Sequence, residues 1–201
     1  MDAVVIRSNE SNVMSEAASA DLIPVISGGG IYDHPTQSLA DLYTLQLERG
    51  AIDGSHVAIV GRVEHRNVNA LIIGLSLFQD ITISVFSLSG AINPEILTLA
   101  SERGIKFREV NSMDEIKNAD VIYLNAPRTQ SHDNLLRSRG IPTININQEF
   151  MDSLDDKAIV MNPIQRSGDF SIEVVDNRLA FYRQSENALI VRMAVLIDIL
   201  S

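Results

Sequence analysis

The chain has 201 residues, 45% hydrophobic and 21% charged, which is the composition of an ordinary globular protein with one large or two small domains. Its net charge of −10 at pH 7 argues against nucleic acid and against an anionic membrane surface as partners. The absence of cysteine excludes disulfides, a thiol nucleophile and thiolate metal sites, and the four histidines show no metal-ligand spacing. No apolar run has the length of a membrane span and the N-terminus resembles a strand, not a signal peptide, so we expect a cytoplasmic protein.

Short runs rich in valine and isoleucine alternate with helical patterns, which predicts an α/β fold with a doubly wound parallel sheet. The predicted strands are 3–6, 24–26, 57–60, 82–86, 106–108, 121–124, 143–146 and 159–160. The predicted helices are 12–20, 35–49, 67–78, 94–103, 113–118, 134–139 and 187–200. The turn after strand 57–60 lacks the second and third glycines of a dinucleotide-binding loop, so we predict no NAD or FAD site, and no cofactor.

The most informative stretch is His34-Pro35-Thr36-Gln37, which leads directly into the predicted helix 35–49. Proline is favourable at the first helical position, because its missing N–H would have no partner there. His34 therefore lies at a helix entrance, where the helix dipole favours an anion or a polarised oxygen. Gln37 lies in the first turn, so an imidazole and a carboxamide are both placed to hydrogen-bond a small planar group. An isolated His-Pro would more often be a helix cap and nothing else.

Arg7 closes the first predicted strand, at the end where parallel α/β proteins bind ligands, and two further arginines follow later predicted strands. Arg7 follows the first strand, Arg66 follows strand 57–60, and Arg128 follows strand 121–124 together with Gln130. A planar guanidinium suits phosphate or carboxylate. From the residues alone, a solvent-exposed residue remains the alternative for Arg7 and for Arg128.

These residues carry a resemblance to a known family. The aspartate carbamoyltransferases share a glycine-rich loop followed by His-Pro-Thr-Gln-x-Leu-x-Asp-Leu-Tyr/Phe-Thr. The matching residues here are Gly28-Gly29-Gly30 and His34-Pro35-Thr36-Gln37-Ser38-Leu39-Ala40-Asp41-Leu42-Tyr43-Thr44. Residues 182–187 and Arg192-Met193-Ala194 resemble the family's closing segment, which we interpret as a cap and a packing face of the last helix.

The resemblance implies two α/β domains, one for carbamoyl phosphate and one for aspartate, bridged by the helix after His-Pro-Thr-Gln and by the last helix. It covers nearly all of this chain but only the later part of the family. We therefore expect residues 1–50 to be a remnant of the carbamoyl-phosphate domain with the linking helix, residues 51–186 to be an aspartate-binding-like domain, and residues 187–201 to pack back on the remnant. The family's Ser-Thr-Arg-Thr phosphate site and its Ser/Lys loop have no counterpart in the 201 residues.

The same resemblance implies residue roles. Arg7 would hold the donor, and His34 and Gln37 would hold and polarise the carbamoyl group, as the catalytic set. The substrate-binding set implied for the acceptor comprises Arg66, Arg128, Gln130, Pro163 and Ile164.

Three departures from the family pattern bear on these roles. Arg62 stands where the family has aspartate, about two extra residues precede Arg128, and Gln165 replaces the second proline of the Pro-Leu-Pro loop.

Two functions of different classes remain open. The first is a chain similar to aspartate carbamoyltransferase, in the pyrimidine pathway, which is inactive alone and takes the carbamoyl-phosphate half from another chain. The second is a non-catalytic relative that acts as a ligand-binding, assembly or regulatory subunit. A natural start before Met1 also stays open. We expect an aspartate-like dicarboxylate as ligand, carbamoyl phosphate as a second one, and a homo-oligomer or a complex with a complementary chain.

Overall fold

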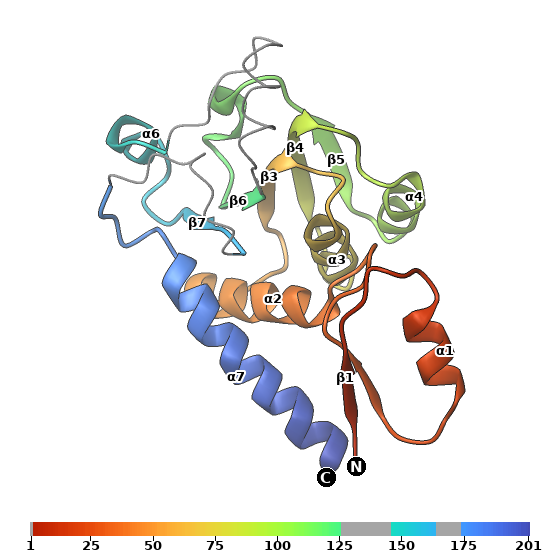
Figure 1. Cartoon of the computed structure of the whole chain (residues 1–201). Helices are drawn as coiled ribbons and strands as arrows, with labels where there is room; N and C mark the ends of the chain where they lie inside the picture. Colours follow the sequence, from red (N-terminus) through yellow and green to blue (C-terminus); the bar gives the residue numbers. More distant parts are fainter. Residues whose placement is uncertain (1, 126–145, 164–173) are drawn as a thin grey trace.

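The computed structural model describes residues 2–125, 146–163 and 174–201, and its main unit is a parallel sheet of five strands in the order β5-β4-β3-β6-β7 (Figure 1). The strands are β3 (His56–Arg62), β4 (Thr82–Ser89), β5 (Lys106–Glu109), β6 (Val121–Asn125) and β7 (Ile159–Met161). The chain starts in the middle at β3, extends to β5 on one side and then returns to add β6 and β7 on the other. This order is that of a doubly wound sheet, so the predicted fold class is confirmed.

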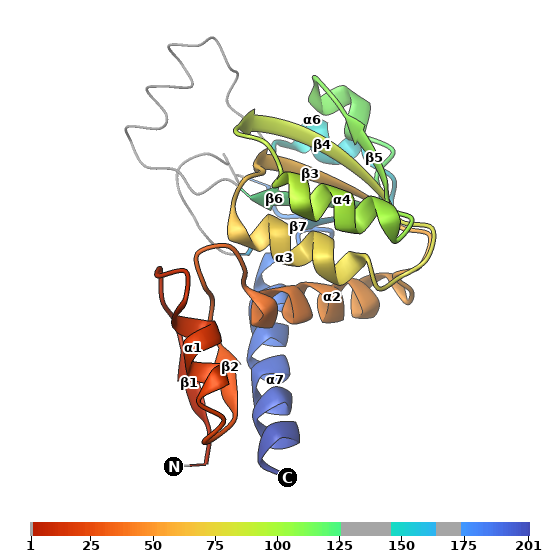
Figure 2. The same ribbon diagram turned by 90° about the vertical axis from the view of Figure 1, so that its right-hand side faces the viewer.

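Helices cover both faces of this sheet (Figure 2). One face packs against α3 (Arg66–Leu75) and α4 (Pro94–Glu102), and the other packs against the short α6 (Gln148–Asp152) and the 3₁₀ helix η1 (Met113–Ile116). Along β3, Val57 and Ile59 join the first core while Ala58 and Val60 join the second, and all four are 0% exposed. A strand buried on both faces has a continuous apolar sequence, which is the pattern that identified it.

A second, smaller unit precedes this sheet. It consists of β1 (Val4–Ile6), α1 (Val13–Ser19) and β2 (Val25–Ser27), and the two strands pair in parallel, separately from the five-stranded sheet. Figure 2 shows this unit to one side of the main sheet and beside the last helix, with the two termini close together. No residue of α1 is buried.

Two long helices connect the units. Helix α2 (Pro35–Arg49) has the predicted bounds, with Pro35 in the first turn and Gly50 as its C-cap at a φ of 80°. Helix α7 (Phe181–Leu200) packs along α2 and begins six residues before the predicted start at residue 187, so that boundary was wrong. The reason is that Gln184 and Asn187 are buried against α2, where they continue the helix instead of capping it.

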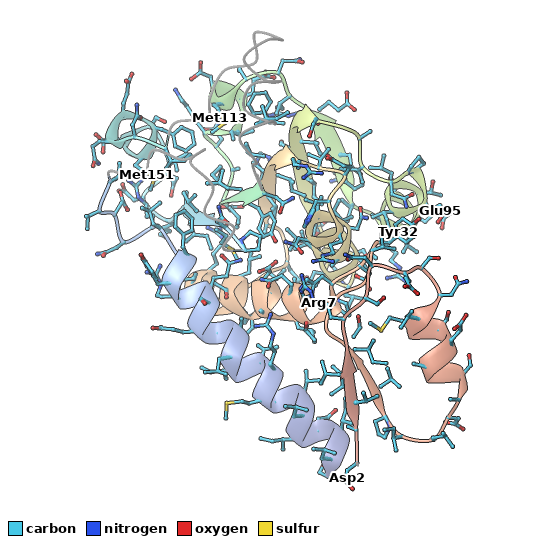
Figure 3. The ribbon with its side chains drawn as sticks, viewed as in Figure 1. Asp2, Arg7, Tyr32, Glu95, Met113 and Met151 are labelled. Carbon is cyan, nitrogen blue, oxygen red and sulfur yellow. The ribbon has the colours of Figure 1, made fainter. Side chains whose placement is uncertain are left out.

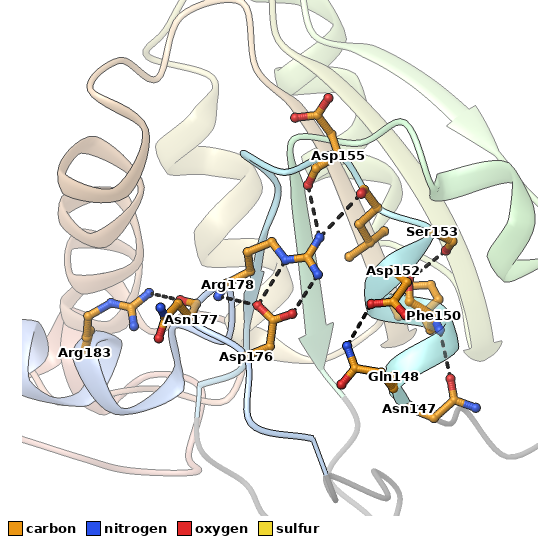
Figure 4. A network of polar contacts seen from close by, with 11 residues as sticks. Asn147, Gln148, Phe150, Asp152, Ser153, Asp155, Asp176, Asn177, Arg178 and Arg183 are labelled. Carbon is orange, nitrogen blue, oxygen red and sulfur yellow. Dashed lines mark hydrogen bonds and ion pairs between the residues drawn. The ribbon is translucent and has the colours of Figure 1, made fainter.

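The chain entering α7 is held by an ion pair (Figure 4). Arg178 donates to both carboxylate oxygens of Asp176, at 3.0 Å from Nε and 2.6 Å from Nη2, and its Nη1 lies 3.4 Å from the carbonyl oxygens of Leu154 and Asp155. The hydrogen bonds from Arg178 hold the pKa of the Asp176 carboxyl below its usual range. Arg183, in the first turn of α7, also donates to the carbonyl of Asn177 at 2.8 Å. The start of α7 is therefore fixed to the main unit.

The remaining predicted elements have mixed outcomes. Predicted helix 113–118 is the shorter 3₁₀ helix η1, and α6 was not predicted because five residues give too little periodicity. Predicted helix 134–139 lies outside the described residues, as does predicted strand 143–146 except for Ile146, which is buried. Within the described ranges no helix has the length and hydropathy needed to cross a membrane.

Candidate functional site

The entrance of α2 is built around His34. Its carbonyl accepts the backbone N–H groups of Gln37 and Ser38 at 3.0 and 3.1 Å, so the residue is fixed by the helix it precedes. The glycine loop lies directly against the imidazole. Gly29 has a φ of +114°, and a Cβ there would lie 3.2 Å from Cδ2 and Nε2 of His34. Only glycine permits this backbone conformation and this close approach.

Two neighbours contact the ring nitrogens of His34. Arg7 Nη1 lies 3.4 Å from Nε2 and donates to the carbonyl of Gly28 at 3.2 Å, while Thr36 Oγ1 lies 3.4 Å from Nδ1. Because a guanidinium only donates, Nε2 is the acceptor of this pair and Nδ1 carries the proton. Figure 3 labels Arg7 at the upper end of β1, next to the start of α2.

His34 is a neutral imidazole at pH 7. Burial, together with the positive charges of Arg66, Arg7 and Arg192, lowers its pKa to about 4. Arg66 belongs to the first turn of α3 and donates from Nη1 to the carbonyl of Gly30 at 2.8 Å, which ties α3 to the glycine loop. Among the residues that the structure describes, its Nε atom is buried and has no hydrogen-bond partner. His34 therefore acts here through hydrogen bonds, in a positive field.

Two cavities adjoin this entrance. The first, of about 270 Å³, has a polar wall of Arg7, His34, Thr36 and Arg192. Apolar residues complete it, namely Val5, Ile26, Val195 and Leu196, with Gly28. This cavity lies between the small β1–β2 sheet and the C-terminal half of α7.

The second cavity, of about 240 Å³, is lined by Gln37, Pro163, Gln184, Ser185, Ala188 and Arg192. Arg192 lines both cavities, and its Nη2 lies 3.4 Å from Oε1 of Gln37. Arg192, in contact with Gln37, is therefore the residue that the two spaces share.

The structure brings most of the predicted site residues that it describes into one region. Arg7, His34 and Arg66 surround the helix entrance, and Gln37 and Pro163 share the second cavity. Arg128, Gln130 and Ile164 lie outside the described residues, as does Gln165. Their roles stay predictions.

Thr36 and Arg192 were missed as site residues. Thr36 belongs to the quoted motif but was given no role, and Arg192 was interpreted as part of a packing face. The guanidinium of Arg192 instead lines both cavities. The signal for it was a lone arginine inside the apolar stretch from Ala188 to Leu196. Among the described residues no group of three histidine, aspartate or glutamate side chains is arranged to hold a metal ion.

A doubly wound sheet with an arginine-lined cavity at a helix entrance has the architecture of an α/β protein for small anionic ligands. Comparison with known families identifies the particular family within this class. Residues 53–199 match the Asp/Orn binding domain of aspartate/ornithine carbamoyltransferase, and residues 1–47 match the carbamoyl-P binding domain of the same family. The chain belongs to the aspartate/ornithine carbamoyltransferase family.

Individual relatives agree with this assignment. The chain is 32% identical to the multifunctional protein CAD of Squalus acanthias, over 100% of this chain and 9% of that protein. It is also 32% identical to the chloroplastic aspartate carbamoyltransferase of Arabidopsis thaliana, over 97% of this chain, and it spans about half, 52%, of that relative's length. Aspartate transcarbamoylase from Trypanosoma cruzi, solved with carbamoyl phosphate and aspartate, superposes with a TM-score of 0.88 at 27% identity, covering 100% of this chain and 66% of that one.

Proposed function

We propose that this chain is the aspartate-binding part of an aspartate carbamoyltransferase, acting in pyrimidine synthesis. The observation that carries the proposal is the convergence of Arg7, Arg66 and Arg192 on a buried, neutral His34 in a chain whose net charge is −10. Such local positive charge supports the binding of anionic substrates. The relative from T. cruzi, solved with carbamoyl phosphate and aspartate, supports the choice of these two.

The reaction would be attack of the aspartate amine on the carbamoyl carbon. A C–N bond forms, the C–O bond to phosphate breaks, phosphate leaves with the bonding pair, and the attacking nitrogen loses a proton. Such a reaction depends mainly on positioning and charge stabilisation. Arg7 would hold the donor. A ligand oxygen that draws Arg7 away from His34 leaves Nε2 free to carry the proton and donate to the carbamoyl oxygen.

Gln37 would hold the donor's carbamoyl group by accepting a hydrogen bond from its NH₂ through Oε1, the atom that faces Arg192. The substrate-binding set would hold the acceptor. Arg66, Arg128 and Gln130 would hold the aspartate carboxylates. Pro163 and Ile164 would direct backbone carbonyls at the reacting amine.

We propose further that these 201 residues are inactive alone and require the remaining carbamoyl-phosphate site from another chain. They contain no Ser-Thr-Arg-Thr run. Large apolar side chains of the small unit are exposed, including Val5, Leu22 and Tyr32, and so are Ile197 and Leu200 on α7. An exposed surface of this kind favours a partner, either a second copy or a complementary chain.

A non-catalytic role as a ligand-binding or assembly subunit is the second candidate. Arg62, where the family has aspartate, pairs with Glu64 at 2.9 Å, so the positive charge introduced at this position is neutralised locally. Because that charge is neutralised, the departure that favours this alternative is Gln165 in place of a proline of the family loop.

Steady-state kinetics with carbamoyl phosphate and aspartate separates the two candidates. We expect no saturable formation of carbamoyl aspartate by the chain alone, and activity when a complementary chain from the same source is added. Activity without any partner would contradict the requirement for a second chain. Inactivity of the reconstituted complex would favour the non-catalytic role. The cytoplasmic location stays a prediction, since the Arabidopsis relative is named as chloroplastic.

Ligand selectivity tests the acceptor site. A pair of arginine–carboxylate contacts distinguishes aspartate from asparagine, so we expect aspartate to bind more tightly, with a dissociation constant on the order of millimolar or about 4 kcal/mol. Arg128→Ala is expected to remove the preference in ligand-observed NMR. Arg108→Ala, on the edge strand β5, removes the same charge away from the site and is the matched control. Equal binding of the two amino acids would contradict the acceptor site.

A further inference from the structure

The face of α2 that meets α7 is polar. Four of its side chains recur at helical spacing, and each contacts a polar side chain of α7. The pairs are Gln37 with Arg192 at 3.4 Å, Asp41 with Gln184 at 2.6 Å, Thr44 with Asn187 at 3.1 Å, and Glu48 with Arg183 at 2.8 Å. We call these eight residues the polar seam. Helices that pack through polar pairs gain orientation from them, because each buried donor or acceptor needs its own partner.

Asp41 is the centre of this seam and is 0% exposed. Its Oδ1 accepts from Nε2 of Gln37 at 2.8 Å and from Nε2 of Gln184 at 2.6 Å, and its Oδ2 accepts from Oη of Tyr123 at 2.8 Å. Oε1 of Gln184 in turn accepts the backbone N–H of Asn162 at 2.9 Å, directly before Pro163. One buried carboxylate therefore joins α2, α7, β6 and the chain leaving β7.

The two neighbours of Gln37 impose the same orientation on its carboxamide. A carboxylate only accepts hydrogen bonds, so the side chain must turn its NH₂ group toward Asp41. A guanidinium only donates, so the carbonyl oxygen must face Arg192. Gln37 consequently presents an acceptor toward the second cavity, which it lines. Without Asp41, the longer contact from Arg192, at 3.4 Å, would be the remaining restraint on the carboxamide among these two neighbours.

We propose that Asp41 is a positioning residue that fixes the Gln37 carboxamide and so makes the site select a ligand group that donates a hydrogen bond. An amide NH₂ satisfies Oε1 of Gln37, whereas a methyl group of the same shape leaves a buried acceptor unpaired. This inference rests on the proposed function, because the donor group in question is the carbamoyl NH₂.

The test compares carbamoyl phosphate with acetyl phosphate, which carries a methyl group in place of the NH₂. By ligand-observed NMR in the cold, the wild-type chain is expected to prefer carbamoyl phosphate by about fivefold, the effect of one hydrogen bond. Asp41→Leu fills the space without an acceptor and is expected to bring the ratio of the two affinities close to one. A uniform loss of binding would leave this ratio unchanged, so the ratio reports orientation and not general damage.

Two further variants sharpen the result. Asp41→Asn is expected to restore the preference, because its Oδ1 still accepts from both glutamines while Nδ2 donates to the hydroxyl of Tyr123. Glu48→Gln removes the charge from another pair of the same seam while keeping an acceptor for Arg183, and it is expected to keep the wild-type ratio. A folded Asp41→Leu protein with an unchanged ratio, or an equal loss in Glu48→Gln, would overturn the proposal.

A ligand-free measurement separates this inference from the proposed function. The side-chain NH₂ protons of Gln37 are expected to exchange slowly with solvent in wild type and in Asp41→Asn, and at least tenfold faster in Asp41→Leu. If wild type binds neither phosphate even with the complementary chain present, the proposed function fails, while this exchange pattern still supports the positioning. Equal exchange in all three proteins overturns the positioning role whatever the ligands do.

Discussion

The five-stranded unit and the β1–α1–β2 unit have strands of similar composition, but they differ in how much of their apolar surface is buried. Both consist of short valine- and isoleucine-rich strands that pair in parallel. In the larger unit β3 is covered on both faces, whereas in the smaller unit Val5 is 58% exposed and Leu22 is 84% exposed. Ile26 is the one buried hydrophobic residue between positions 2 and 33. The composition of a strand thus favours pairing with another strand. Whether the paired strands form part of a buried core depends on how many of their faces other elements cover.

The site lies between these two units, and this position explains its composition. Arg7 and the glycine loop come from the smaller unit, Arg66 and Pro163 come from the larger one, and His34, Gln37 and Arg192 come from the two helices between them.

The largest expected effect contrasts the two units directly. Leu71 of α3 is 0% exposed in the first core, so Leu71→Ala is expected to lower the free energy of unfolding by about 2–5 kcal/mol. Leu22→Ala, the same truncation in the smaller unit, is expected to change it by less than about 0.5 kcal/mol. Urea denaturation of the isolated chain measures both. Comparable losses would mean that the smaller unit has a core of its own.

The Asp41 carboxyl, at the junction between the units, is expected to make the stability of the protein depend on pH. Burial raises the pKa of the Asp41 carboxyl to about 6, against hydrogen bonds from Gln184, Tyr123 and Gln37 and the charge of Arg192, which lower it. The unfolded chain ionises this group near pH 3.8, so between pH 4 and 6 the folded state binds more protons and stability falls as pH rises. Relative to Asp41→Asn, wild type is expected to lose on the order of 3 kcal/mol over this window.

Urea denaturation of both proteins at a series of pH values measures this difference. His34 and His65 act in the opposite direction, because burial and nearby arginines lower the pKa of each to about 4, and folding then becomes less favourable as pH falls below about 6.5. Both histidines are present in the two proteins, so their contribution cancels. A constant difference between the proteins from pH 4 to 7 would contradict the raised pKa of the buried Asp41 carboxyl.

The smallest effect on stability is expected at the exposed face of the smaller unit, where the effect on assembly should be large. Val5→Lys is expected to weaken self-association at least about tenfold while changing the free energy of unfolding by less than about 0.5 kcal/mol. Light scattering over a dilution series measures the association. Leu77→Lys, at a residue 72% exposed beyond α3, is the matched control and is expected to associate like wild type. Equal weakening by both variants would show that the small unit is not the contact surface.

Local sequence patterns determined much of the fold. Apolar runs predicted β3, β4, β6 and β7, and their alternation with helices predicted a parallel sheet, because buried parallel strands need crossover helices. Pro35 and Gly50 set both ends of α2 through their own backbone preferences. The start of α7 was predicted wrongly because it does not depend on local preferences. Gln184 and Asn187 are helical by virtue of what they contact in α2.

The sequence by itself also determined which side chains stand at the helix entrance, since His34 and Gln37 are placed by one turn of α2. Only the tertiary structure decided what surrounds them. Asp41 receives hydrogen bonds from residues 82 and 143 positions away, and Gln37 contacts Arg192 across 155 positions. Helical and strand periods are local properties of the chain, whereas these contacts depend on how α2 and α7 cross. The local motif therefore determines which functional groups stand at the helix entrance. The packing of the helices determines which residues orient those groups.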